Sequence, residues 1–253
     1  MLMTKRRLWR TSTVIMSIAV GVVFTAAIPS AAAHGRIQLQ SVAIASGGAG
    51  LVVTASYNCP GKGLPFGVVA AAQNVGSGRI QTQFEYVETP RCSPGKRVLF
   101  ATALPPPTQD DNPGDPRFVA NAPWRADPLV LSISIDNSGL FRTVTPRVVT
   151  ISSKSISSTG RLLAHGAGAS LVLTTACRQS QSPPGSVFVV LQMTQIIRGA
   201  AQTMTIYPSV VCDGRTHRST VVVPTSGAPW RSGPAFVVIS GDISAFGEVR
   251  LAP

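Results

Sequence analysis

Charged, aromatic and histidine residues are all scarce in this sequence of 253 residues. Charged residues make up 13% of it and aromatic residues 6%, and there are 3 histidines and 4 cysteines. No CxxC pair and no cluster of cysteine with histidine occurs, so we predict neither a metal site nor redox catalysis. Long capped helical patterns are also missing. Glycine, proline, serine, threonine and valine abound instead, and this composition predicts an all-β protein with frequent turns.

Runs of basic residues are absent from the folded part of the chain, although the chain as a whole is basic. There are 22 Lys and Arg residues against 10 Asp and Glu, for a formal net charge of +12. The 18 basic residues that follow residue 33 stand singly or in pairs, without the stripes interleaved with aromatics that nucleic-acid binding favours, so we predict no nucleic-acid partner. A basic surface suits anionic cell-wall polymers by general electrostatics. These polymers, or another envelope protein, are the predicted partners.

The first 33 residues have the order of a secretory signal peptide. Four basic residues precede an apolar segment over residues 13–28, and three alanines at 31–33 offer a cleavage site before His34. The apolar segment is shorter than the ~20 residues of a spanning helix, which disfavours the alternative of an uncleaved anchor. No second long apolar run follows. We therefore expect a secreted product with no transmembrane segment and a formal charge of +8.

A four-residue motif divides the rest of the chain into two copies. The string APWR occurs at residues 122–125 and again at 228–231, and it holds the only two tryptophans after residue 9. An alternating apolar run follows each copy, from Leu129 and from Ala235, and predicts a strand. A tryptophan just before a buried strand is most simply a core anchor. If the rings face outward instead, they form stacking sites with their arginines, so the candidate binding residues are Trp124, Arg125, Trp230 and Arg231.

Other segments repeat in the same order. Strand patterns at 37–44 and 51–59 return at 162–164 and in a strand that ends at Cys177, each pair joined by a glycine turn. The apolar stretch 66–73 returns at 187–195. A helix over residues 187–197 is the alternative for the last of these, but β-branched residues favour a strand. About seven short strands per copy indicate two tandem immunoglobulin-like β-sandwiches, with a small Greek-key barrel as the alternative.

The domain limits follow from composition. Residues 34–153 form the first predicted domain and residues 154–253 the second, with the polar segment 152–160 as linker. The first copy is 14 residues longer between its second cysteine and its tryptophan. This excess falls in a stretch rich in proline and aspartate, which predicts an exposed inserted loop near residues 105–118.

Four cysteines allow three pairings, and the repetition selects one of them. Cys59 and Cys92 lie at the same points of the first copy as Cys177 and Cys212 do in the second. Export places them in an oxidising compartment. We therefore predict the disulfides Cys59–Cys92 and Cys177–Cys212.

Two groups of residues invite a chemical interpretation. His217 could act as a general base, oriented by Asp213, with Ser219 as nucleophile, but no GxSxG motif accompanies them. The first copy has no histidine there, so we predict no catalytic residue and treat His217 only as a candidate binding residue. Asp110, Asp111 and Asp115 could bind calcium but lack the EF-hand spacing, and a solvated turn explains them better.

Several of these features together resemble a known group of proteins. A signal peptide precedes strands that end in cysteine, a glutamine follows an apolar strand (Gln73, Gln195), and the string CDGRTHR begins at Cys212. This pattern resembles secreted actinomycete proteins with tandem immunoglobulin-like domains of unknown function. The first copy departs from it at residues 93–95. The resemblance implies an exported β-sandwich protein with internal disulfides, and it implies no activity.

The predicted function is accordingly broad. We expect an exported, non-enzymatic protein without cofactor, acting as a binding or structural module of the bacterial cell envelope or medium. One alternative is a small-ligand carrier resembling the immunoglobulin-like chromoproteins of actinomycetes, which an apolar cleft with solvent-facing Phe66, Phe84, Phe118 or Phe141 would favour. A second alternative is a hydrolase that uses His217. The oligomeric state is not specified by the sequence.

Overall fold

The computed structural model describes residues 35–88, 90–107, 117–136, 138–176, 185–225, 227–241 and 243–253. Within these ranges the chain forms β-strands and two short 3₁₀ turns, η1 (Ser46–Gly48) and η3 (Ala164–Gly166), and no α-helix. The described part therefore has the all-β character that the composition predicts. It also contains no helix with the length and apolar character needed to cross a membrane. The predicted signal peptide lies outside the described residues.

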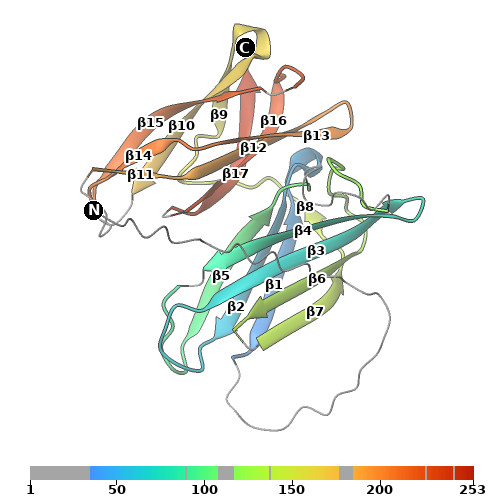
Figure 1. Ribbon diagram of the computed structural model, residues 1–253, viewed down its shortest axis with the longest axis vertical. Helices are drawn as coiled ribbons and strands as arrows, with labels where there is room; N and C mark the ends of the chain where they lie inside the picture. Colours follow the sequence, from blue (N-terminus) through green and yellow to red (C-terminus); the bar gives the residue numbers. More distant parts are fainter. Residues whose placement is uncertain are drawn as a thin grey trace, which may run out of the picture. The chain divides into compact units, whose positions relative to one another are not determined.

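The first half of the described chain contains eight strands. They are β1 (Ile37–Ile44), β2 (Leu51–Asn58), β3 (Phe66–Gly76), β4 (Arg79–Glu88), β5 (Arg97–Leu104), β6 (Leu129–Ile135), β7 (Ser138–Val144) and β8 (Arg147–Val148). They form two four-stranded sheets, in the orders β5-β2-β1-β8 and β4-β3-β6-β7 (Figure 1). The alternating residues of β6 show why a core forms: Leu131, Ile133 and Ile135 are fully buried in one hydrophobic cluster with residues of both sheets.

The second half contains nine strands. They are β9 (Thr159–Leu163), β10 (Gly168–Ala176), β11 (Gly185–Phe188), β12 (Val190–Ile197), β13 (Ala200–Ile206), β14 (Ser209–Cys212), β15 (Thr216–Pro224), β16 (Gly233–Ser240) and β17 (Ala245–Ala252). Seven of them form one sheet in the order β13-β12-β16-β17-β9-β10-β15, and β11 pairs with β14 (Figure 1). A second hydrophobic cluster, made only of residues from this half, lies against these strands.

The two halves have corresponding strand orders. If β7 and β8 are counted as one strand, the first half reads β5-β2-β1-β8/β7-β6-β3-β4, and the large sheet of the second half reads β15-β10-β9-β17-β16-β12-β13. In the second half this position is held by one continuous strand, β17. In the first half the strand is interrupted between β7 and β8, which belong to different sheets. Each strand of the seven-stranded sheet therefore has a counterpart in the first half with the same neighbours.

Two predicted segments differ in detail from their sequence patterns. The stretch 187–195 is extended, as β-branched content indicated, but it divides at Val189 into β11 and β12. In the predicted linker, Ile156 is buried in the core of the second half and forms a bridge with Leu173. A single apolar residue among serines gives too little pattern to reveal such a contact. The proposed domain limits remain predictions.

Candidate functional site

The two tryptophans of the repeated motif lie in the cores. Trp124 is 2% exposed and Trp230 is 1% exposed. The indole N–H of Trp124 donates to the carbonyl oxygen of Leu104 at 3.0 Å, and that of Trp230 donates to those of Val223 at 3.2 Å and Pro224 at 3.1 Å. Burial with a satisfied N–H is what a core anchor requires. Neither ring is available as a stacking surface.

A glycine turn receives each tryptophan backbone. The amide of Trp124 donates to the carbonyl oxygen of Gly48 at 3.0 Å, and the amide of Trp230 donates to that of Gly166 at 2.9 Å. Both glycines have positive φ angles, of 82° and 94°. A Cβ on Gly48 would lie 2.3 Å from the Trp124 oxygen, and one on Gly166 would lie 2.2 Å from the Trp230 oxygen. Only glycine fits this close approach.

A buried glutamine holds the residue after each tryptophan. The side-chain amide of Gln73 donates to the carbonyl oxygens of Arg125 at 2.8 Å and Asp127 at 2.9 Å, and its oxygen accepts from the Arg125 amide at 2.9 Å. Gln195 makes the equivalent pair with Arg231, at 2.8 and 2.9 Å. These bonds satisfy backbone groups that would otherwise be buried without partners. We call these contacts the glutamine clamp.

A second glutamine supports the clamp in each half, but in different ways. Gln81 donates to the side-chain oxygen of Gln73 at 3.1 Å. Its counterpart Gln202 donates instead to the Thr225 hydroxyl at 2.9 Å and to the Ala228 carbonyl at 2.6 Å. The sequence showed the positions of these glutamines but not their partners. Apart from the contact of Gln81 with Gln73, those partners lie 23 to 54 residues away in the chain.

The arginines of the repeated motif are exposed. Arg125 donates from Nη1 to the carbonyl oxygen of Val75 at 3.3 Å. Trp124 and Trp230 point into the cores while Arg125 and Arg231 lie at the surface, so the structure does not bring each tryptophan ring and its arginine together at a ligand site. The repeated motif therefore has a structural role in both halves.

His217 and Asp213 are in contact at the turn before β15. Their Nε2 and Oδ1 atoms are 2.7 Å apart. The hydrogen bond from His217, with a second from the Arg215 amide, lowers the pKa of the Asp213 carboxyl. Among the described residues, no hydrogen bond joins Ser219 to His217. The pair lies at the surface, where the His217 and Asp213 side chains are 30% and 40% exposed, and it closes a turn.

The predicted bridge between Cys59 and Cys92 is present, with Cα atoms 5.4 Å apart. Cys212 is disulfide-bonded as well. Its predicted partner Cys177 lies outside the described residues. So do Asp110, Asp111 and Asp115, and no group of three or more metal-ligating side chains occurs among the residues that are described.

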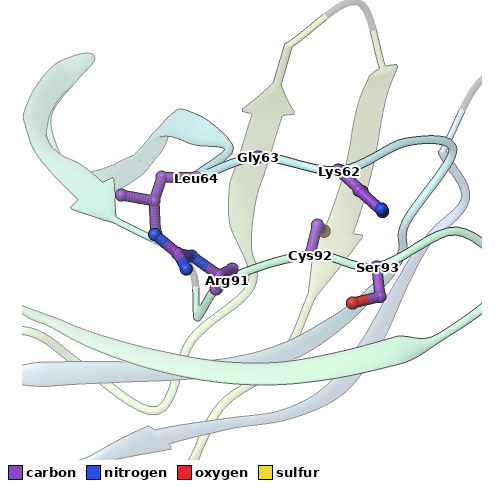
Figure 2. A pocket seen from close by; sticks show the side chains of 6 residues that line it. All are labelled: Lys62, Gly63, Leu64, Arg91, Cys92 and Ser93. Atoms are coloured by element: carbon purple, nitrogen blue, oxygen red, sulfur yellow. The ribbon is translucent and has the colours of Figure 1, made fainter.

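A pocket opens beside the Cys59–Cys92 bridge. Residues 62–64 and 91–93 face each other across it, joined by two backbone hydrogen bonds between Gly63 and Cys92 (Figure 2). Figure 2 shows Leu64 opposite Arg91 and Lys62 opposite Ser93. The pocket measures about 460 Å³. Within the described part of the chain, no ion pair involves Lys62 or Arg91, the two basic residues that line the pocket.

Three aromatic side chains stand on the outer face of the β4-β3-β6-β7 sheet near this pocket. Phe66, Phe84 and Tyr86 are 53%, 54% and 59% exposed. The rings of Phe66 and Tyr86 stack with centroids 5.4 Å apart, and those of Phe84 and Tyr86 meet edge to face at 5.7 Å. Leu64, which is 69% exposed, lies two residues before Phe66 and lines the pocket. We call Phe66, Phe84 and Tyr86 the aromatic cluster.

The aromatic cluster reverses the usual strand pattern. In β4 the glutamine Gln81 is fully buried, whereas Phe84 and Tyr86 are exposed. When polar and aromatic residues alternate along a strand, the aromatic face is ordinarily expected to point into the core. A sequence signal for the opposite orientation is that Gln81 recurs in the second copy as Gln202.

The comparisons with known proteins are distant. No protein-family model and no curated protein matches the sequence. A crystal structure of red sea bream transglutaminase is similar at 13% identity with a TM-score of 0.24, over 86% of this chain and 31% of the transglutaminase. The structure of CBD12 from CALX1.2 is similar at 8% identity with a TM-score of 0.23, over 81% of this chain and 79% of that one. This chain thus spans about a third of the transglutaminase's length.

Proposed function

We propose that the protein is an exported, non-enzymatic binding module of the bacterial cell envelope or medium, made of two tandem immunoglobulin-like sandwiches. Its ligand is an anionic cell-wall polymer. The single observation that carries this proposal is the pocket with Lys62 and Arg91 beside the exposed aromatic cluster. The disulfide between Cys59 and Cys92 supports export, because such bonds persist in oxidising compartments.

The chemistry of the pocket suits a polymer that is both anionic and rich in sugars. An arginine and a lysine bind phosphate or carboxylate oxygens, the first with a planar fork and the second as a point charge. The faces of aromatic rings carry negative potential and attract the C–H groups of a sugar ring. A chain-like ligand would reach from the two cations across Leu64 to Phe66 and Tyr86.

The test compares two double variants with the same change in charge. Lys62→Glu/Arg91→Glu reverses the two pocket cations, and Lys154→Glu/Arg198→Glu reverses one exposed lysine and one exposed arginine elsewhere. Binding to isolated cell walls is measured before and after chemical removal of their anionic polymers. We expect the pocket variant to lose at least tenfold in affinity, which corresponds to about 1.4 kcal/mol, and the control to stay within about twofold of wild type.

Three outcomes decide the proposal. The proposal is supported if the protein no longer binds walls stripped of their anionic polymers and if the pocket variant loses more affinity than the control variant. An equal loss in both variants would mean that binding depends only on net charge, and the pocket would then have no special role. Failure of the unaltered protein to bind intact walls contradicts the function itself.

One observation favours a second candidate, the small-ligand carrier. Phe66, Phe84 and Phe141 all face solvent, at 53%, 54% and 76% exposure. An apolar small molecule would cover the first two of these rings. Mass spectrometry of an extract of the natively purified protein tests this candidate: a bound apolar compound that Tyr86→Ala releases supports it, and an empty extract contradicts it.

A further inference from the structure

The η1 turn of the first half packs against the outer face of the β12-β16-β17 strands. Phe236 on β16 is 1% exposed, and the side chains that bury it are small: Ala45, Ala49, Val52 and Ala103. Gly50 approaches most closely, since a Cβ there would lie 2.3 Å from the Phe236 ring. The contact is thus a close-packed apolar one. We call the residues of the first half in this contact the donor end and those around Phe236 the acceptor face.

Hydrogen bonds surround this apolar contact. The carboxylate of Glu248 accepts from the amide of Ser46 at 2.8 Å and from that of Ile151 at 3.3 Å. The amide of Ala201 donates to the carbonyl oxygen of Asn121 at 2.7 Å. An apolar centre with hydrogen-bonded edges is the usual anatomy of a specific interface.

An acceptor face also exists in the first half. Aligned on the repeated tryptophans, the pairs of β6 with β7 match the pairs of β16 with β17. The matching pairs are Val130 with Thr143 and Ser132 with Phe141 in the first half, and Phe236 with Glu248 and Val238 with Phe246 in the second. Phe141 is 76% exposed, whereas its counterpart Phe246 packs against the apolar contact. The acceptor face of the first half is therefore uncovered.

A donor end likewise exists in the second half. Its η3 turn corresponds to η1, and the pair Ser170 with Val222 corresponds to Val52 with Ala103. Val222 is 52% exposed, while Ala103 is 2% exposed. The donor end and the acceptor face therefore each occur twice. The donor end of the first half and the acceptor face of the second half cover each other, and the other two are exposed.

We propose that the free donor end of one molecule docks on the free acceptor face of a second copy of the same chain, as η1 docks within the chain. The contact is head-to-tail, so it leaves a free surface at each end and assembles an open chain of molecules. The acceptor face of the first half offers less apolar surface, with Val130 in place of Phe236 and Ser132 in place of Val238. The association is therefore weaker than the internal contact. Net positive charge opposes it, and added salt strengthens it by screening this repulsion.

The experiment is sedimentation velocity of the purified protein over a range of concentrations, at low and at moderate salt. The expected result is a weight-average mass that rises with concentration, and rises further with salt. Phe141→Ser on the acceptor face and Val222→Glu on the donor end each abolish this rise. Phe188→Ser is the matched control, because Phe188 is equally exposed at 76% but lies on β11. It should associate like the unaltered protein.

A mixture separates this geometry from a symmetric dimer. Phe141→Ser retains a donor end and Val222→Glu retains an acceptor face, so an equimolar mixture of the two forms dimers that cannot grow further. Circular dichroism confirms that each variant is folded, and His165→Glu replaces Val222→Glu if that variant is not. The proposal is overturned if the unaltered protein stays monomeric throughout, if Phe141→Ser associates normally, or if the mixture stays monomeric. Because the pocket residues are unchanged in these variants, cell-wall binding is scored separately.

Discussion

The two halves of the molecule use one strand order to build different sheets. In the second half, β17 pairs with β16 on one side and β9 on the other, so seven strands form one sheet. In the first half the corresponding segment forms two strands: β7 pairs with β6 in one sheet, and β8 pairs with β1 in the other. Pro146 stands in the gap and corresponds to Leu251, which pairs on both sides. Because proline has no N–H to donate, a single residue at this point separates one sheet into two.

The halves agree in their interiors and differ at their surfaces. The glycine turns, the tryptophan anchors and the glutamine clamp recur with nearly the same distances. The aromatic cluster recurs only in part: Phe66 and Tyr86 correspond to the exposed Phe188 and Tyr207, whereas Phe84 on β4 corresponds to Thr205 on β13, aligned on Gln81 and Gln202. Constraints on packing are the same in both halves, whereas the surface is free to specialise. The following predictions test how far that equivalence extends.

The tryptophans should show the largest effect. Trp124→Ala and Trp230→Ala each leave a large cavity and an unsatisfied carbonyl, so each should lower the free energy of unfolding by about 3–5 kcal/mol. Denaturant unfolding followed by far-ultraviolet circular dichroism measures this. Arg231→Ala, at an exposed position, is the control and should change stability by no more than about 0.5 kcal/mol. A cost below about 1 kcal/mol for either tryptophan would show that the anchors are not equivalent.

Removal of the first disulfide should come next. Cys59→Ser/Cys92→Ser opens a loop of 33 residues and should lower the free energy of unfolding by about 3.5 kcal/mol, since the unfolded chain regains its freedom. Thermal unfolding of this variant, with Ser93→Ala as control, measures the loss. An unchanged melting temperature would mean that the core of the first half holds without its bridge.

The glutamine clamp should distinguish the halves. Gln73→Ala leaves the amide and carbonyl of Arg125 without partners and also frees Gln81, and we expect a cost of about 2–3 kcal/mol. Gln195→Ala should cost less, because Gln202 keeps its own bonds to Thr225 and Ala228. Chemical denaturation of both variants measures the difference, with Gln192→Ala on the opposite face of β12 as control. An equal loss of stability in Gln73→Ala and Gln195→Ala would show that the glutamine clamp contributes equally in the two halves.

Glu85 should show the smallest effect, which depends on pH. Burial raises the pKa of this half-buried carboxyl on β4. Its counterpart on β13, aligned on Gln81 and Gln202, is Ile206, which packs against the core of the second half. A raised pKa means that the folded state holds the proton more tightly than the unfolded state. The stability that this proton contributes is present below the ordinary pKa and is lost as the pH rises through the folded-state pKa.

Glu85→Gln should therefore raise the free energy of unfolding at pH 7 by roughly 0.5 kcal/mol and should flatten its dependence on pH above the ordinary range of a glutamate. Glu85→Ile, which installs the residue of the second half, should stabilise the protein further by burying apolar surface. Unfolding free energies measured from pH 4 to pH 8 test both variants. A dependence on pH that both substitutions leave unchanged would show that another group titrates.

Much of the fold was predictable because it depends on local patterns. The alternating residues after each tryptophan predicted β6 and β16, and Leu131 and Val237 are indeed fully buried. The repeated spacing predicted the Cys59–Cys92 bridge. Patterns failed where a residue's contacts are non-local, as for Ile156 among its serines. The candidate site was predicted least well, because Lys62 and Arg91 are 29 residues apart and meet only through the pairing of Gly63 with Cys92.

By itself, the sequence determined which residues alternate, where turns interrupt them, and that these patterns occur twice in one order. The period of two in a strand dictates these features residue by residue. The tertiary structure alone decided whether the outer face of each sheet is covered as well. Phe246 packs against a covered contact while its counterpart Phe141 is exposed, because the coverage of a face depends on a segment far away in the chain and not on the strand itself.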